Sequence, residues 1–510
     1  MIFKLFPQRP DHPLADGKEL KRILAELLVE RPNNAVDEIL GWYESLKQAR
    51  DFRLDHYFDV LRQLDDAAQQ HLRALERDYL GGADDGSDLL RQRIWTRSHA
   101  YWSEVAALYS LCLARARLDP KGRGSEAFKP WVPLVETRLQ AARRNRLKWL
   151  AYHYAPVDEG LWYGLGGSYL AAEAAGQAQK PLQIYPAQKG LTSVAQQYLH
   201  ALVFFTSAMD GLLPQQVELA DRLIAHFLPG FVFSPSRRPD SLYWVDAATG
   251  AAPARLARVP GTTRPSLRFL SPGPALLAVD ELIRSVERGQ IPVDLNLGGE
   301  YPPKVLLPVL RHLRVYWELR PPQRRHQRHA VRTRMAVLAG FDHCLVVFAG
   351  DAANHERTPG VQHWVVENVS LGGFLACHDD ASSDGIKLGA LLCMQAEGGD
   401  NWLLGVVRRF NRLTGSRTSI GVQVLSRRAQ SVELRPRRSG FAAAMVIPGI
   451  CLCPGGEAGV LRFVLPPGAF RVRESLDFAL ADRRCVLTPM DVEESGGDFE
   501  IARFREQLAG

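Results

Sequence analysis

The spacing of hydrophobic residues changes along the chain and divides it into differently folded regions. From Asp16 to Asp119 apolar residues recur every three or four positions, which predicts amphipathic helices. Further helices are expected at 132–152, near 190–209 and at 214–227. Because each apolar stripe must be covered by another element, we expect residues 1–228 to form an antiparallel α-helical array.

The next region, residues 229–319, mixes two kinds of pattern. Residues 229–303 contain eleven prolines and three short extended runs, FVFS (231–234), SLYWV (241–245) and SLRFL (266–270). Helical patterns follow at about 274–288 and 303–317. This region is therefore predicted to be a small mixed α/β connector.

From Arg328 onward the pattern is that of strands. Short runs rich in β-forming residues are separated by Gly, Asn, Asp and Ser turns, which predicts a compact β-barrel over residues 320–430. The runs are MAVLAGF (335–341), CLVVFAG (344–350), HWVVENV (363–369), FLACH (374–378), KLGALLCM (387–394), WLLGVVRRF (402–410) and SIGVQVLS (419–426). Residues 431–510 are expected to form a second, β-rich module from AAAMVIPG, GVLRFVLP, FRVRE and DFEIARF. The fold class expected for the whole chain is multidomain α+β.

The formal charge of +7 is unevenly distributed over the 510 residues. Residues 321–340 carry five arginines and no acid, and residues 401–440 carry nine arginines against one glutamate. These two windows sum to +13, so the remaining 450 residues sum to −6. Arginine without lysine favours planar, bidentate recognition of phosphate or guanine over diffuse attraction.

Two motifs lie in this order around the predicted barrel. Arg324-Arg325-His326-Gln327-Arg328 contains R-x-x-x-R and stands just before the first strand, while 368–373, NVSLGG, contains [DN]-x-S-x-x-G and ends another strand. Together they resemble the two signatures of the PilZ domain, over about residues 320–430. The resemblance implies a six-stranded antiparallel barrel of a bacterial signalling protein that binds the second messenger cyclic di-GMP.

The chemistry of the same residues fits such a ligand. A guanidinium can donate two hydrogen bonds to guanine O6 and N7, stack on a purine or clamp a phosphate. The turn after the strand can offer an amide and a hydroxyl, and its glycines permit positive φ and close backbone approach. The expected ligand-binding residues are Arg324, Arg325, Arg328, Asn368, Ser370, Gly372 and Gly373. Arg328 and Arg332 form a second R-x-x-x-R; we prefer Arg324 and Arg328 because Arg332 is expected within the strand.

Other chemistry is weakly represented. No catalytic motif and no metal-ligand spacing is found, so we expect no enzyme, cofactor or metal. Gly164-Leu165-Gly166-Gly167 lacks the third glycine of a dinucleotide fingerprint and is interpreted as a turn between helices. Scattered cysteines and the lack of a signal peptide or of an apolar run long enough to span a bilayer predict a cytoplasmic protein with buried thiols.

The sequence therefore predicts a cyclic di-GMP receptor that signals through its helical region, which would bind a protein partner. We expect the ligand to order the arginine segment between the helical half and the barrel. Two alternatives remain: a nucleic-acid-binding protein using the arginines of 408–428, which leaves Asn368-x-Ser370 unexplained, or a PilZ-like scaffold without ligand that binds proteins.

Overall fold

The structure is a computed structural model in which the chain forms two compact units, Met1–Pro322 and Gln323–Gly510. The residues it describes are 11–49, 51–81, 88–188, 190–257, 264–293, 295–320, 326–350, 360–379, 386–413, 417–437, 446–453, 459–480 and 483–508. Each unit is described by itself below.

Helices dominate the first two thirds of the first unit, as their apolar period predicted. Side-chain caps begin several of them: Asp16 accepts hydrogen bonds from the N–H groups of Lys18 and Glu19 ahead of α1, and Asp158 accepts one from Leu161 N–H at α7. The helices are η1 Pro13–Ala15, α1 Gly17–Val29, α2 Pro32–Gln48, α3 Leu54–Gly81, α4 Asp88–Leu118, α5 Ser125–Phe128, η2 Lys129–Trp131, α6 Val132–Tyr152, α7 Glu159–Ala174, α8 Val194–Thr206, η3 Met209–Gly211, α9 Pro214–Phe227 and η4 Leu228–Gly230.

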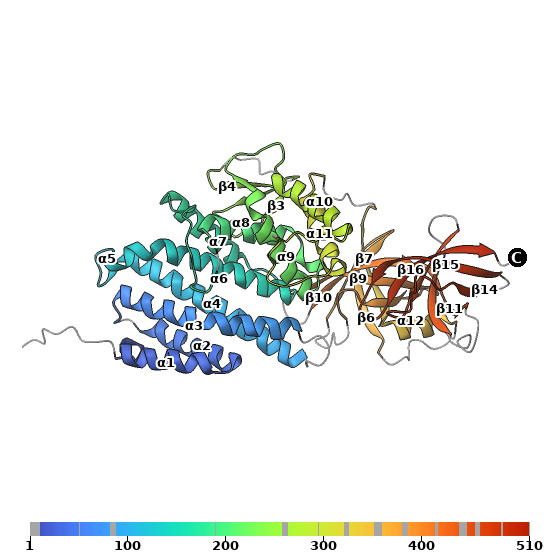
Figure 1. Ribbon diagram of the computed structural model, residues 1–510, viewed down its shortest axis with the longest axis horizontal. Coiled ribbons are helices and arrows are strands. Elements are labelled where there is room, and N and C mark those ends of the chain that lie inside the picture. Colours follow the sequence, from blue (N-terminus) through green and yellow to red (C-terminus); the bar gives the residue numbers. More distant parts are fainter. Residues whose placement is uncertain are drawn as a thin grey trace, which may run out of the picture. The chain divides into compact units, whose positions relative to one another are not determined.

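The long helices lie side by side, and α3 and α4 run antiparallel (Figure 1). Arg115, late in α4, donates a hydrogen bond to the carbonyl of Phe52 just ahead of α3, whereas Tyr101, halfway along α4, donates to Asp65 in the middle of α3. This is the array that the sequence predicted.

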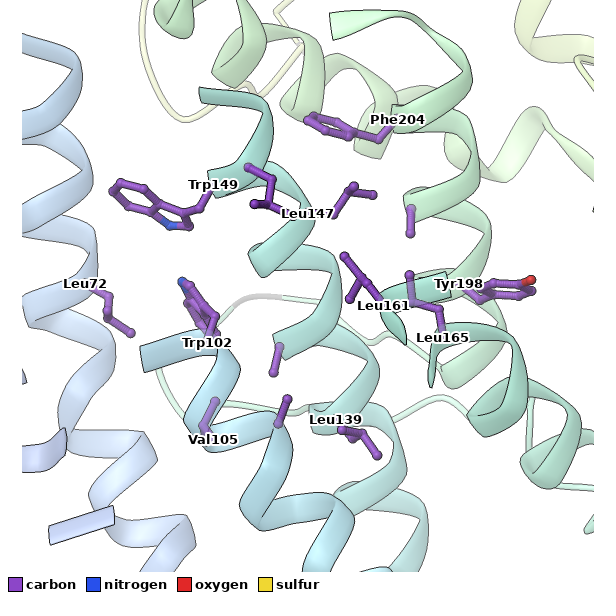
Figure 2. Close-up of a cluster of buried hydrophobic side chains, with 14 of the residues drawn as sticks. Leu72, Trp102, Val105, Leu139, Leu147, Trp149, Leu161, Leu165, Tyr198 and Phe204 are labelled. Atoms are coloured by element: carbon purple, nitrogen blue, oxygen red, sulfur yellow. The ribbon is translucent and has the colours of Figure 1, made fainter. Parts of the chain in front are cut away.

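A continuous apolar core fills the space between these helices. Figure 2 shows Leu72, Trp102 and Trp149 in the space between α3, α4 and α6. On the other side of α6, Leu161 and Leu165 of α7 are buried against the same core. Helix α8, whose sequence is apolar nearly all round, is buried along most of its length.

The glycine cluster 164–167 is not a turn, so that prediction was wrong. It lies inside α7, where a Cβ on Gly166 would stand 2.1 Å from the carbonyl oxygen of Ala247. Gly166 thus allows α7 to approach the backbone that follows a strand of the small sheet. Close packing, rather than chain reversal, explains this glycine.

The mixed segment folds as predicted into strands followed by two helices. Four antiparallel strands have the order β1-β4-β2-β3, and the helices α10 and α11 follow along the chain. The predicted run SLRFL falls largely in β4, whose residues are all buried. The bounds are β1 Val232–Ser234, β2 Tyr243–Asp246, β3 Ala254–Arg255, β4 Leu267–Ser271, α10 Pro274–Glu287 and α11 Pro303–Trp317.

The second unit begins with a closed six-stranded antiparallel barrel of order β10-β7-β6-β5-β8-β9. A six-stranded antiparallel barrel in this part of the chain is what the resemblance implied. Leu404 and Val406 are fully buried, but they lie in a cluster with Ile450 and Ile501 of the C-terminal module, so this face of the strand packs outside the barrel. The strands are β5 His329–Ala339, β6 Gln362–Ser370, β7 Gly373–His378, β8 Leu391–Ala396, β9 Trp402–Arg412 and β10 Thr418–Ser426.

One predicted strand of this barrel is a helix. The run CLVVFAG falls largely in α12 Phe341–Phe348, which follows Gly340 at φ 103°. Phe341, Cys344 and Val347 are buried at helical spacing. A short, continuously apolar run fits a buried strand and a buried helix equally well, so its period could not decide between them.

The C-terminal residues form a second closed six-stranded barrel of order β11-β12-β13-β16-β15-β14. The predicted strand FRVRE is wrong: residues 470–474 form a turn in which Glu474 N–H donates to Arg471 O, and the Phe470 N–H donates to the carboxylate of Glu500. The strands are β11 Arg428–Pro436, β12 Ile447–Cys453, β13 Val460–Leu465, β14 Leu476–Leu480, β15 Arg483–Ser495 and β16 Glu500–Leu508.

The whole is a multidomain α+β protein, as predicted, in which the C-terminal module is a barrel of its own. The six cysteines whose side chains are described are buried thiols. Among the described residues, no helix combines the length and the apolar character needed to cross a bilayer.

Candidate functional site

A hollow of about 510 Å³ opens on the first barrel where the two sequence motifs meet. One wall is formed by His326 and Gln327 of the lead-in segment (residues 323–328) and by His329 at the start of β5. The opposite wall is the turn between β6 and β7. This turn lines the hollow with Val369, Ser370 and Leu371.

The lead-in segment is described only from His326 onward. Arg328 immediately precedes β5, whereas Arg332 and Arg334 lie within that strand, as the sequence predicted. Arg324 and Arg325 lie outside the described residues. The preference for the Arg324 and Arg328 pair therefore stays a prediction.

The β6–β7 turn is held in shape by its serine and its second glycine. Ser370 Oγ donates a 3.0 Å hydrogen bond to the carbonyl of Gly373, which is also its cross-strand partner. A Cβ on Gly373 would lie 2.1 Å from the carbonyl oxygen of Val422 in β10, so only glycine fits between the strands. Gly372 has no positive φ, and a Cβ there would meet His326 at an ordinary 3.5 Å.

Asn368 carries an unsatisfied polar atom beside this turn. It is paired with Ala330 of β5 and Leu375 of β7. Within the described part of the chain its Oδ1 is buried and accepts no hydrogen bond. A buried acceptor without a donor is costly, and in native proteins such groups are usually satisfied. Asn368 is not among the residues that line the hollow, so its role in binding stays a prediction.

A third segment also reaches the hollow. Arg427, between β10 and β11, donates a hydrogen bond of 3.1 Å to the carbonyl of Leu371 and lines the hollow. Leu371 and Val369 are large apolar side chains that remain 63% and 37% exposed at its rim. The site thus combines a guanidinium, imidazoles, a hydroxyl and exposed apolar surface.

The comparison with known families concerns the other unit of the chain. Residues 18–237 match the family model described as "Cyclic-di-GMP receptor FimW, N-terminal domain". The match covers less than half of the chain and ends ahead of the lead-in segment. No curated protein and no solved structure is significantly similar to the chain.

This match and the PilZ resemblance share no residue. The first rests on helices of the N-terminal unit, and the second on two motifs of the first barrel. Both lead to receptors of the same ligand, so the resemblance to a cyclic di-GMP receptor family is confirmed from a separate part of the chain. The FimW family is described as a receptor and not as an enzyme.

Sequence reasoning missed part of what lines the hollow. Five lining residues were not among the expected ligand-binding residues, although all but His329 lie within the motifs: His326, Gln327, His329, Val369 and Leu371. Arg427 was assigned only to the alternative nucleic-acid surface. Its position in the arginine-rich window 401–440 was the available signal, but the pairing of strands was needed to place it against the turn.

Two of the other arginines of 408–428 are paired with acids. Arg408 makes a bidentate ion pair with Glu494 of the second barrel, and Arg417 pairs with Glu367 at 2.8 Å. Their charge is therefore partly neutralised within this unit. In the described residues no group of three His, Cys, Asp or Glu side chains is placed to hold a metal ion.

Proposed function

We propose that the protein is a receptor for cyclic di-GMP and that the ligand binds in the hollow between the lead-in segment and the β6–β7 turn. The observation that carries the proposal is that His326 and Gln327, within the first PilZ-like motif, and Ser370 of the second line one hollow although they are far apart in sequence. The family match of residues 18–237 supports the same ligand from the other unit.

The groups around the hollow complement the parts of cyclic di-GMP. The ligand presents two guanine edges, two guanine faces and two phosphates. Arg328 and Arg427 can donate to phosphate or to guanine O6 and N7. The unsatisfied Oδ1 of Asn368 can accept from a guanine N–H group, and Leu371 offers exposed apolar surface to a purine face. Arg324 and Arg325 complete the proposed set, together with Ser370, Gly372 and Gly373.

The site also suggests how a signal arises. The lead-in segment begins at the boundary between the two compact units. Ligand contacts to its arginines would shift it toward one conformation, because binding stabilises the conformation with the higher affinity. We propose that this change is transmitted to the helical unit and to a protein partner bound there. Hydrogen exchange across residues 318–334 tests this transmission. The proposal is wrong if saturating cyclic di-GMP leaves the exchange rates unchanged.

We propose no catalytic step for this receptor and no cofactor. Because cyclic di-GMP is an intracellular second messenger, we propose a cytoplasmic location. The ion pairs of Arg408 and Arg417 weigh against a continuous nucleic-acid surface.

Calorimetric titration of the full-length chain with cyclic di-GMP tests the function. We expect saturable binding that Arg328→Ala weakens at least about tenfold, since a hydrogen bond to a charged group contributes roughly 1.5–3 kcal/mol. Arg462→Ala is the matched control, because Arg462 pairs with Glu493 on the second barrel at 2.8 Å. It should bind like the wild type.

The outcomes separate the three functions. If the folded wild-type protein does not bind cyclic di-GMP, the receptor function is refuted and the ligand-free scaffold remains. If Arg328→Ala and Arg462→Ala lose affinity for cyclic di-GMP equally, the proposed location of the binding site is refuted. Nucleic-acid affinity that falls steeply with salt, without cyclic di-GMP binding, would favour the nucleic-acid alternative.

A further inference from the structure

A second hollow, of about 690 Å³, lies on the outer wall of the C-terminal barrel. Its floor is formed by Val486 and Thr488 of β15 and Gln507 of β16. Cys485 and Leu487, which alternate with the β15 residues, are buried in the barrel core. The floor residues therefore point outward, and Val486 and Gln507 are direct cross-strand partners.

The wall of this hollow is formed by residues 471–475, which overlap the turn at 470–474 where the sequence predicts the strand FRVRE. It contributes Arg471, Val472, Arg473, Glu474 and Ser475, and Arg437 after β11 stands beside it. A hydrogen bond from Arg437 N–H to Ser475 O, 2.9 Å long, ties the two segments together. The arginines thus project from a turn that is fixed to its neighbours.

The positive charge around the hollow is incompletely neutralised. Arg471 Nε lies 3.7 Å from Glu474 Oε2, and Arg437 Nε lies 3.5 Å from Asp477 Oδ1. Both distances exceed those of well-formed charged hydrogen bonds, about 2.7–2.9 Å. Within the described part of the chain Arg473 makes neither a hydrogen bond nor an ion pair. Arg505, the cross-strand partner of Thr488, adds a further exposed charge next to the floor.

These features favour one chemical class of ligand. Three arginines against one glutamate line the hollow, so its charge favours an anion. Guanidinium groups bind phosphate bidentately, and the hydroxyls of Thr488 and Ser475 and the amide of Gln507 can add hydrogen bonds. The volume lies in the range of small-molecule sites, about 300–1,000 Å³.

We propose that this hollow is a second ligand site that binds a phosphate-bearing anion of nucleotide size. The site is separate from the one on the first barrel, and the proposal does not rest on the proposed function. It gives the C-terminal barrel a binding role of its own.

Calorimetric titration of the full-length chain with GTP and with inorganic pyrophosphate, at about 50 mM salt to limit screening, tests the proposal. We expect GTP to bind, and Arg473→Gln to weaken the binding at least about tenfold through loss of a charged contact. Arg462→Gln, on the same barrel but paired with Glu493, is the matched control and should leave it unchanged. Arg328→Ala should also leave it unchanged, which separates this site from the first hollow.

Each outcome of these titrations either supports or overturns the second site. Pyrophosphate binding that is sensitive to Arg473→Gln supports recognition through phosphate alone, and GTP binding without pyrophosphate binding supports recognition of the nucleotide as well. Absence of binding by either anion would overturn the proposal, as would binding that Arg328→Ala abolishes or that Arg473→Gln leaves intact. Single-stranded RNA that binds more tightly with length and loses affinity in Arg473→Gln would show a polyanion surface in place of a nucleotide site, and would also overturn it.

Discussion

Replacing Arg138 by methionine should strongly destabilise the helical unit, because it leaves a buried carboxylate without its cation. The Asp65 side chain is completely buried in α3, and that of Arg138 in α6 is 3% exposed. Arg138 Nη1 donates to Asp65 Oδ2 at 3.2 Å, while the hydroxyls of Tyr101 and Tyr109 donate to the two Asp65 oxygens at 2.6 and 2.5 Å. Nη2 also donates to Asp66 at 2.7 Å.

The expected size follows from this burial. Removing one partner of a buried ion pair costs about 3–5 kcal/mol, because the other charge is left uncompensated. The two tyrosine hydroxyls keep Asp65 hydrogen-bonded, so we expect the loss for Arg138→Met at the lower end, about 3 kcal/mol. If Asp65→Asn is added, the buried charge disappears, and the double variant should lose less than the sum of the single losses.

Urea unfolding followed by circular dichroism at 222 nm measures the loss, since nearly all helices of the described chain belong to the first unit. Arg97→Met is the control, because Arg97 pairs with Asp37 at 2.6 Å on the surface, where such a pair contributes about 0–1 kcal/mol. A loss for Arg138→Met no larger than that for Arg97→Met, or strict additivity with Asp65→Asn, would refute the reasoning.

Three further predictions concern glycine packing and pH. Gly166→Ala should destabilise the helical unit by about 1–3 kcal/mol, because the new Cβ would lie 2.1 Å from a backbone carbonyl oxygen. Gly167→Ala, whose Cβ would have nothing within 4 Å, should stabilise the unit by up to about 1 kcal/mol. Urea unfolding measures both changes. Gly373→Ala should weaken cyclic di-GMP binding several-fold in calorimetry, because β7 and β10 must separate to admit the new Cβ. Gly372→Ala should bind the ligand like the wild type. Equal affinities of the two variants would contradict the assigned turn geometry. Burial lowers the pKa of His200 in the folded protein. As the pH falls through about 6.5, the unfolded chain therefore binds a proton at this ring before the folded protein does. The stability that comes from the neutral, buried ring is thus present above that pH and is lost below it. Melting temperatures between pH 7.5 and 5.5 should therefore fall less for His200→Gln than for the wild type, and identical slopes would show that the ring does not stay neutral in the fold.

The limits of sequence reasoning appear at particular elements. The helical period of residues 54–64 and the alternation at 363–369 each fit one structure only, and both were predicted correctly. CLVVFAG carries no such period, and its helix is decided by burial of Phe341, Cys344 and Val347. FRVRE has the composition of a strand, yet the carboxylate of Glu500 binds its backbone N–H group at Phe470 in place of a neighbouring strand.

By itself the sequence determined the order of helical and β-rich regions and the two motifs at the lead-in segment and the β6–β7 turn, because these depend on local spacing and composition. Tertiary structure decided which distant residues share a site. Arg427 reaches the turn only because β10 pairs with β7, and the arginines of 471–473 surround a hollow only because β14, β15 and β16 pair below them. Strand pairing joins positions far apart in the chain, and a charge pattern read along the sequence carries no information about those neighbours.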